Sequence, residues 1–464
     1  MVFSSIPFLY FFLPTVLIAY FVVPEKLKNA VLLFFSLGFY WWGEPKYALL
    51  MIFTITFCYG AARLIENRRE KSRERKLLLI LSVAVPLGFL AVFKYADFFI
   101  GTFDALTGAD IPFLKLALPI GISFYTFQAV SYIIDVYRGD IPAEKNLITL
   151  SAYITLFPQL IAGPIIRYSD VADDMNNRKI NLKNASDGIR RFVFGLGKKV
   201  LIANLLGTIC VTYRASTDIS VLYAWIYAIA YTLQIYFDFS AYSDMAIGLG
   251  KIMGLNFMEN FNYPYIAKSI TEFWRRWHIS LSSWFRDYVY IPLGGNRVKK
   301  SRHILNIMIV WCLTGFWHGA GWTFIVWGLY FGILLLCEKL IWGKAIKKAP
   351  SVIRHIYVMF IVIISFVIFN AASFTEAWTD ILNLLGATGI PAVSESAIYA
   401  LKSNAVLFAV AFFAATPVMK KLCFRYENKA VVKALEVVSI VAVLVVSTAY
   451  LVDGSFNPFL YFRF

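Results

Sequence analysis

Long apolar runs constrain the fold of this chain more than any other feature of its sequence. Residues 3–23, 77–99, 355–374 and 434–452 are predominantly apolar, and the mean hydropathy of the chain is +0.67. A run of roughly 17 to 25 apolar residues spans a bilayer as a helix, because lipid leaves the backbone only hydrogen bonds within the segment. No sustained strand-like alternation favours a barrel. We therefore expect an all-α integral membrane protein embedded in a lipid bilayer.

Basic residues gather in short loops, and this pattern sets the predicted orientation. The net charge is +16, and the loops around Lys26, at 63–76, at 343–354 and at 420–425 are rich in Lys and Arg. The loops 100–112 and 375–401 contain neither residue. Placing every basic loop in the cytoplasm predicts about eleven crossings and an extracytoplasmic C-terminus. The charge is explained by membrane orientation, so it does not indicate nucleic-acid binding.

Three segments depart from a simple crossing. The first run, 3–23, has no basic start and no small-residue cleavage site, so we expect a retained helix and not a signal peptide. Residues 147–163 contain Pro158 and end at Gly163, which favours a re-entrant segment. Residues 248–303 are aromatic, basic and turn-rich, which is typical of helices that lie on or dip into the cytoplasmic face.

One of the four histidines, His318, lies between two apolar runs. An ionisable group inside a membrane segment is costly and suggests function, and histidine moves protons near neutral pH. The flanking Gly315, Gly319 and Gly321 allow a backbone or a substrate to approach closely. We therefore predict that His318 is a catalytic base. By contrast, His303 and His355 stand next to arginines in basic loops and are expected to be packed or snorkelling residues without a catalytic role.

Residues 234–322 carry most of the polar and aromatic motifs, and we treat them as a catalytic core. His278 follows Trp274 by four residues, so both are expected on one face of a helix, with Arg275 and Arg276 between them. His278 is either a second catalytic group or a packed residue at the membrane edge. The two arginines bind either the phosphates of an anionic donor or lipid headgroups.

Asp238 and Asp244 are expected near the end of an apolar run, and two interpretations stay open for them. They either form a polar relay, or they are helix-end carboxylates that pair with a cytoplasmic arginine. A zinc protease, an esterase or a nucleotide hydrolase is not indicated, since the sequence contains no H-E-x-x-H, GxSxG or Walker motif. The five scattered cysteines form no CxxC pair, so we expect packing residues and no metal site.

Four motifs together resemble the membrane-bound O-acyltransferase (MBOAT) family, in particular its bacterial alginate O-acetylation type. They are YFDFSAYSD at 236–244, FWRRWHISLSSW at 273–284, YIPLGGN at 290–296 and GFWHG at 315–319. Residues 119–127 and 157–164 extend the resemblance over nearly the whole chain. It implies one membrane domain over 1–464, with helices around a central tunnel. It places the family's signature histidine on His318 and its second histidine on His278.

The resemblance also implies a reaction. The family's donor enters from the cytoplasm, usually as acetyl-CoA, and no cofactor is permanently bound. His318 would take the proton of the acceptor hydroxyl, while His278 or a backbone N–H would polarise the thioester carbonyl. We expect Trp274, Arg275 and Arg276 near the donor. The acetyl group would reach a cell-envelope polysaccharide outside the bacterial inner membrane, with help from an extracytoplasmic serine-esterase-like (SGNH-type) partner.

The C-terminal stretch 453–464 carries a further expectation. Its sequence from Asn457 to Phe464, NPFLYFRF, is similar to the aromatic-tyrosine motif of a small peptide that works with D-alanyl-transferring members of the family. In that peptide the tyrosine hydroxyl carries the acyl group, and the matching residue is Tyr461. The alternative is a helix end with aromatic interfacial anchors.

The sequence leaves three other functions open. They are a transporter or flippase for a polysaccharide precursor, a scaffold subunit of an envelope-synthesis complex, and a family member with another acyl donor or acceptor. No inverted repeat is apparent, which weakens the transporter interpretation.

Overall fold

The computed structural model describes residues 3–68, 72–161, 163–426, 429–454 and 460, and all regular elements in these ranges are helical. Internal contacts divide the chain into two compact units. The first comprises residues 1–192 and 243–259, and the second comprises 193–242 and 260–464. Two long helices, α9 (Leu182–Gly197) and α11 (Val221–Ile252), contribute residues to both. The prediction of an all-α protein is confirmed for the described part of the chain.

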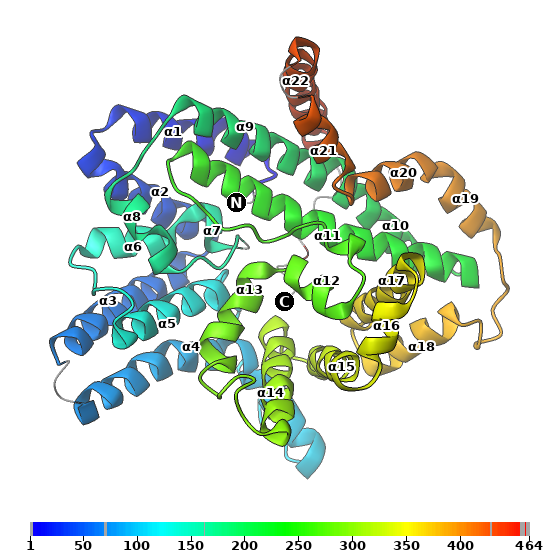
Figure 1. Ribbon diagram of the computed structural model, residues 1–464, viewed down its shortest axis with the longest axis horizontal. Helices are drawn as coiled ribbons and strands as arrows, with labels where there is room; N and C mark the ends of the chain where they lie inside the picture. Colours follow the sequence, from blue (N-terminus) through cyan, green and yellow to red (C-terminus); the bar gives the residue numbers. More distant parts are fainter. Residues whose placement is uncertain (1–2, 69–71, 162, 427–428, 455–459, 461–464) are drawn as a thin grey trace. The chain divides into compact units, whose positions relative to one another are not determined.

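The first unit packs short and long helices around aromatic side chains. The rings of Phe8 and Phe157 meet with centroids 6.3 Å apart, and Phe39 lies 6.0 Å from Phe157. Helices α3, α4 and α5 lie side by side (Figure 1). The helices that belong wholly to this unit are α1 (Leu13–Val22), α2 (Lys28–Gly43), α3 (Pro45–Asn67), α4 (Ser72–Thr107), α5 (Ile122–Arg138), α6 (Leu147–Thr155), α7 (Phe157–Leu160) and α8 (Tyr168–Asn176), with the short turns η1 (Phe8–Phe12) and η2 (Glu25–Leu27).

The second unit holds both histidines of interest. Its first helices are the π-helical η3 (Lys198–Ala203), α10 (Asn204–Ala215), η4 (Pro264–Ile266), α12 (Ile270–Arg276), α13 (Ile279–Phe285), η5 (Arg286–Tyr290), α14 (Lys300–His318) and α15 (Trp322–Cys337). They are followed by η6 (Glu338–Trp342), α16 (Gly343–Lys348), α17 (Ser351–Asn370), α18 (Phe374–Leu384), α19 (Glu395–Ser403), α20 (Ala405–Ala414), α21 (Val418–Arg425) and α22 (Ala430–Val452).

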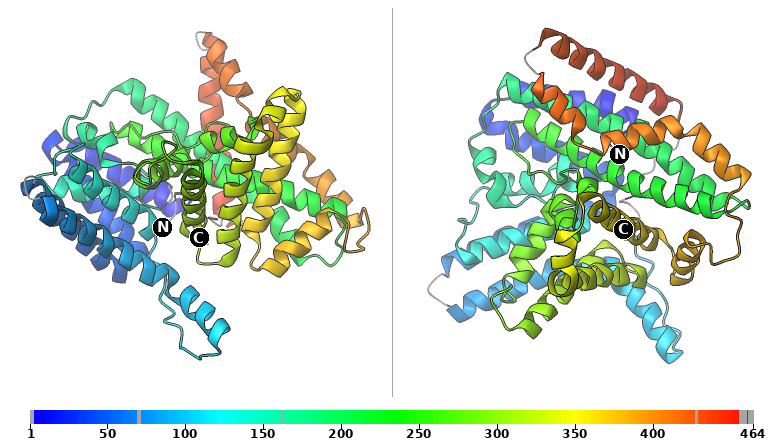
Figure 2. Two further views of the ribbon diagram at one scale, coloured as in Figure 1. Left: turned by 60° about the horizontal axis from the view of Figure 1, so that its bottom comes forward. Right: turned by 45° about the vertical axis from the view of Figure 1, so that its right-hand side comes forward.

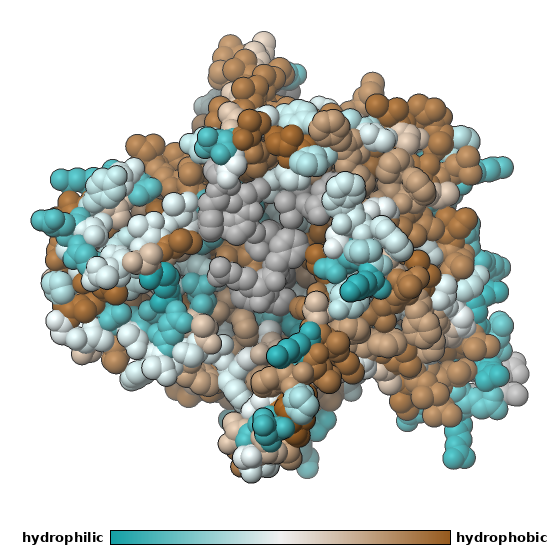
Figure 3. All heavy atoms as spheres, turned by 180° about the vertical axis from the view of Figure 1, so that it is seen from behind, coloured by the Kyte–Doolittle hydropathy of each residue, from teal (hydrophilic) through white to brown (hydrophobic). Residues whose placement is uncertain are grey.

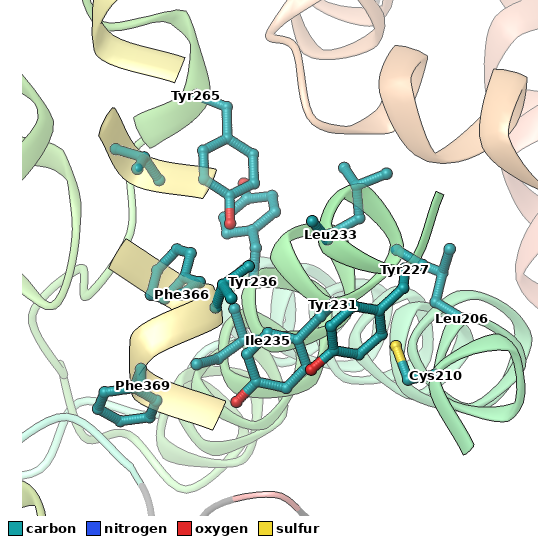
Figure 4. Packing of buried hydrophobic residues seen from close by; sticks show 14 of the residues in the cluster. Leu206, Cys210, Tyr227, Tyr231, Leu233, Ile235, Tyr236, Tyr265, Phe366 and Phe369 are labelled. Atoms are coloured by element: carbon teal, nitrogen blue, oxygen red, sulfur yellow. The ribbon is translucent and has the colours of Figure 1, made fainter. Parts of the chain in front are cut away.

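The core of the second unit forms where α10 and α17 pack against α11. Helix α10 runs beside the first half of α11 (Figures 1 and 2), and the ring of Tyr213 stacks on that of Tyr227 at 4.5 Å. Figure 4 shows the α11 side chains between Leu206 and Cys210 on one side and Phe366 and Phe369 on the other. All of these side chains are buried. This packing fixes the part of α11 that leads into the YFDFSAYSD motif.

Helices α14 and α15 form a hairpin whose backbones touch. A Cβ atom at Gly315 would lie 2.2 Å from the Phe324 carbonyl oxygen, and one at Gly328 would lie 2.2 Å from the Trp311 carbonyl oxygen. Only glycine permits this approach, because any side chain would overlap the facing backbone. The expectation that Gly315 serves close backbone contact is therefore confirmed. The hairpin sets the position of His318, which is the last residue of α14.

Among the residues that the structure describes, six helical stretches are long and apolar enough to cross a membrane, or seven if the bent pair α19 and α20 is one span. They are Pro45–Asn67, Ser72–Thr107, Leu182–Ala215, Trp322–Lys348, Ser351–Asn370 and Ala430–Val452. Figure 3 shows apolar side chains over α22, at the top of the view, where Leu435 is 61% and Val438 63% exposed. Such a surface suits lipid. Other predicted crossings are shorter, such as the 16-residue α2, so the number eleven stays a prediction.

One expected loop was wrong, and one expected crossing has different bounds. The segment 375–401 was predicted to be a loop, but α18 and α19 begin there on the side-chain caps of Ser373 and Ser394, which accept from the backbone N–H groups of Glu376 and Ala397. The predicted crossing 403–419 contains α20, which forms with α19 a helix pair bent by 57° that counts as one possible span. Serine caps stabilise helix starts that a hydropathy pattern does not register.

Replacing Gly328 with alanine is expected to destabilise the protein by about 1–3 kcal/mol, because the added methyl group would force α14 and α15 apart. Gly38 in α2 is the control, since a Cβ there meets nothing within 4 Å. Gly38→Ala should leave stability unchanged or raise it by about 0.5–1 kcal/mol. Thermal unfolding of both purified variants measures the difference. Equal melting temperatures would contradict a tight α14–α15 contact.

Candidate active site

His318 lies at the C-terminal end of α14 and is enclosed by aromatic rings. His318 is 6% exposed. The rings of Trp317, Trp327 and Phe369 meet the imidazole edge-on, with centroids 5.1, 5.1 and 5.4 Å away. These rings come from α14, α15 and α17. They keep bulk water from the imidazole, so a proton transfer at this side chain would take place in dry surroundings.

His278 stands at a break between α12 and α13 and not within one helix as predicted. Trp277 is extended, and His278 has φ 45° and ψ 54°, in the left-handed region. The helix breaks at this point because the segment 260–262 runs alongside it and takes its backbone hydrogen bonds. Its Asn260 carbonyl accepts from Ile279 N–H at 3.0 Å, and its Asn262 N–H donates to the Arg276 carbonyl at 2.9 Å. These bonds replace helical ones, so Trp274 and His278 do not share a helix face.

The side chain of Asn260 determines which nitrogen of His278 carries the proton. The Asn260 Oδ1 atom accepts from the backbone N–H of Ser280 at 3.2 Å and from its hydroxyl at 2.9 Å. The same oxygen lies 3.1 Å from His278 Nδ1. Because an oxygen only accepts, Nδ1 of His278 must donate. The neutral ring then carries a lone pair on Nε2, which argues against the expected role of His278 in polarising a carbonyl.

The two histidines are neighbours inside the second unit. Their ring centroids are 6.4 Å apart, and His278 is 1% exposed. The ring of Phe239 in α11 meets His278 edge-on at 4.7 Å. Burial, and to a smaller degree the neighbouring His318, holds the pKa of His278 well below its ordinary value of 6.5. His278 is therefore neutral at physiological pH.

The three residues expected near the donor have different surroundings. Trp274 is buried against Trp311, Trp327 and Phe331, with the Trp327 centroid 5.7 Å away. Arg276 forms an ion pair with Glu272 at 2.9 Å and donates to the Asn262 carbonyl at 3.0 Å. Arg275 is exposed, and no ion pair holds it within the described ranges. Arg275 is thus the better placed of the two to meet an incoming anion.

Glu338 holds α12 in place, and the sequence interpretation missed it. Its carboxylate accepts from the backbone N–H groups of Ile270 at 3.0 Å and Thr271 at 2.9 Å, and from the Thr271 hydroxyl at 2.8 Å. A carboxylate at a helix start satisfies backbone donors and matches the helix dipole. The signal was present, since a Glu in the apolar run LLLCEKL is unusual. A charged residue in an apolar run indicates either a functional site or a structural anchor.

The two aspartates of the YFDFSAYSD motif lie inside α11 and not at its end as predicted. Each carboxylate pairs with a cationic side chain. The helix α11 can therefore continue past both aspartates. Asp244 pairs with Arg191 at 2.9 Å in the first unit, and Arg191 also binds Glu259. This contact favours the ion-pair interpretation of Asp244. Asp238 pairs with Lys199 at 2.5 Å in the second unit.

Tyr461, the proposed carrier, lies outside the described residues. Its neighbour Leu460 is described and is buried. Within the described ranges, no three His, Cys, Asp or Glu side chains come together as a metal site.

The chain matches a family model and is similar to several known proteins. Residues 141–377, which include both histidines, match the model of the MBOAT, membrane-bound O-acyltransferase family. The chain is 45% identical to the "Probable alginate O-acetylase" of Azotobacter vinelandii, over 82% of this chain and 77% of that protein. It is 34% identical to the peptidoglycan O-acetyltransferase of Helicobacter pylori, over 84% and 81%. It is 33% identical to the teichoic acid D-alanyltransferase of Bacillus subtilis, over 50% and 62%.

The chain therefore belongs to the membrane-bound O-acyltransferase family. It is an acyltransferase that uses an acyl donor, and its apolar helices make it a multi-pass membrane protein. The enzyme prediction is confirmed, and the transporter and scaffold alternatives are not favoured.

The lowered pKa of His278 predicts a pH dependence of stability. The unfolded histidine binds a proton below pH of about 6.5, whereas the folded one stays neutral, so stability falls as the pH drops through that value. Between pH 7 and pH 5 the wild type should lose more stability than His278→Gln, by at most about 2 kcal/mol if the folded imidazole stays neutral throughout. Chemical unfolding at both pH values measures this difference. His355→Gln is the control and should behave like the wild type, whereas an equal loss in His278→Gln would refute the prediction.

Proposed function

We propose that this protein moves an acetyl group from cytoplasmic acetyl-CoA to a polysaccharide of the cell envelope outside the bacterial inner membrane. One observation supports the chemistry above all, namely the pair of buried histidines with ring centroids 6.4 Å apart. Both lie in the segment that matches the acyltransferase family. The names of the relatives, alginate O-acetylase and peptidoglycan O-acetyltransferase, support an envelope polymer as acceptor.

In the proposed reaction, His318 takes the proton of a hydroxyl group as its oxygen attacks the thioester carbonyl carbon. The C–S bond then breaks, and protonated His318 gives this proton to the leaving thiolate of CoA. Transfer needs this base because an ordinary tyrosine hydroxyl has a pKa of about 10. His278, with its lone pair on Nε2, would accept a hydrogen bond and orient the reacting groups. A backbone N–H would polarise the carbonyl oxygen.

The donor would approach on the side of α12. Arg275 would meet its phosphates, because Arg276 is already paired with Glu272. Trp274 would support this region as part of the packed aromatic cluster. The competing ligand for Arg275 is a lipid headgroup, which carries the same phosphate chemistry.

An acetyl group fits the comparisons better than a D-alanyl group. The resemblance to the alginate O-acetylase covers 82% of this chain, whereas that to the D-alanyltransferase covers 50%. Tyr461 would carry the acetyl group as an ester and present it outside. An SGNH-type partner would then transfer it from this ester to the polymer.

His318→Ala should lower acetyl transfer by about 10²–10⁴-fold, since it removes the general base. The measurement compares base-labile acetate on cell-envelope polymers in a deletion strain complemented with wild type or variant. Membrane levels and melting temperature of the variant should match those of the wild type. His355→Ala is the matched control and should retain normal acetate. Normal acetate with His318→Ala would remove this residue from the reaction.

Tyr461→Phe should abolish labelling of the C-terminal peptide by isotopically labelled acetyl-CoA and stop transfer to the outer acceptor. The phenyl ring keeps the aromatic surface, so only the hydroxyl is lost. Mass spectrometry of the peptide that contains residue 461 gives the readout. Tyr399→Phe, at a tyrosine that is 75% exposed on α19, is the control. If Tyr461→Phe transfers label as well as the wild type, Tyr461 is not the carrier.

A further inference from the structure

A buried ion pair in the second unit has no part in the reaction described so far. The ammonium of Lys199 lies 2.5 Å from Asp238 Oδ1, and both side chains are 3% exposed. Lys199 belongs to η3, a π-helical segment between α9 and α10, and Asp238 belongs to α11. Removing two charges from water is costly, so such a pair is weak evidence for stability. Insertions of π-helix are frequent at functional sites, which directs attention to Lys199.

The second carboxylate oxygen of Asp238 binds Leu460, a described residue near the end of the chain. Asp238 Oδ2 accepts from the backbone N–H of Leu460 at 2.9 Å. The side chain of Leu460 is 6% exposed and belongs to the same core cluster as Tyr236 and Phe366. A charged acceptor makes a stronger hydrogen bond than a neutral one. Leu460 is thus fixed by both its backbone and its side chain, although it is 222 residues from Asp238 in sequence.

This contact is close to the histidine pair along α11. Asp238 is followed by Phe239, whose ring meets His278 edge-on at 4.7 Å. Consecutive Cα atoms are about 3.8 Å apart. One short stretch of α11 therefore holds Leu460 with one residue and supports His278 with the next.

We propose that Lys199 and Asp238 are positioning residues that hold Leu460 at the part of α11 whose next residue, Phe239, contacts His278. Lys199 pairs with one oxygen of the Asp238 carboxylate, and the other oxygen accepts from the backbone N–H of Leu460. The residue that follows Leu460 is Tyr461. The docking itself is independent of the proposed function, but its use in catalysis rests on Tyr461 being the acyl carrier.

Trimming by carboxypeptidase Y tests the docking without reference to activity. The full-length protein in lipid nanodiscs is digested from its C-terminus, and the products are read by intact mass. The test variant is Lys199→Met/Asp238→Leu, which replaces both charges with apolar side chains of similar size and leaves no unpaired charge. The control is Asp187→Asn/Arg190→Gln, which removes an exposed ion pair of α9 with a spacing of 2.9 Å.

The wild type and the control should yield products that retain Leu460, whereas the double variant should be trimmed past it. Retention of Leu460 in a folded double variant would overturn the docking. If the double variant does not fold, Asp238→Asn replaces it, because its amide oxygen keeps an acceptor but loses the charge. Trimming of this variant should be faster than that of the wild type, and equal rates would overturn the proposal.

A second readout separates the docking from the proposed function. Labelled acetyl-CoA should place about 100-fold less acetyl on Tyr461 in the double variant, because a small misplacement of reacting groups has an effect of this size. Unlabelled Tyr461 in the wild type would contradict the carrier role, and the trimming result would still decide the docking. Normal labelling in a double variant that is trimmed past Leu460 would show that the docking does not position the carrier.

Discussion

The site depends on the hydrogen bonds between residues 260–262 and the break between α12 and α13. Asn260 accepts from three donors around His278, and its backbone takes the N–H of Ile279. Without these bonds, α12 would have no reason to end at Arg276, and His278 would follow a helical path. The left-handed backbone at His278 is a strained conformation that surrounding contacts must maintain. The structure thus uses main-chain hydrogen bonds to bring His278 to His318.

Much of the architecture could be predicted because apolar runs in lipid have few alternatives to helices. The runs at 355–374 and 434–452 correspond to α17 and α22. His318 could be singled out since a polar group among apolar residues is conspicuous. The α12–α13 break was missed because spacing of three or four residues predicts a continuous helix, whereas the bonds that interrupt it come from a distant segment. The continuation of α11 past Asp238 was missed for a similar reason, since its partner Lys199 is 39 residues earlier.

The parts of the candidate site share burial away from water. The aromatic rings around His318, the buried His278 and the Lys199–Asp238 pair all belong to the second unit. Polar groups in such surroundings keep fixed partners, because an unpaired group would be costly. A fixed set of partners is what acyl transfer requires, since the base and the hydroxyl must meet in one geometry. The family membership shows an acyltransferase, and the buried histidine pair supports the base that we propose for it.

The most direct test of the central claim is a structure of the full chain in nanodiscs with acetonyl-CoA, in which a CH₂ group separates the sulfur from the ketone and prevents transfer. Our account predicts that the ketone carbonyl lies beside the two imidazoles, with His318 within a hydrogen-bond distance of about 3 Å from the site of the attacking hydroxyl. It also predicts the phosphates on the side of Arg275. A ketone bound away from both histidines would contradict the account.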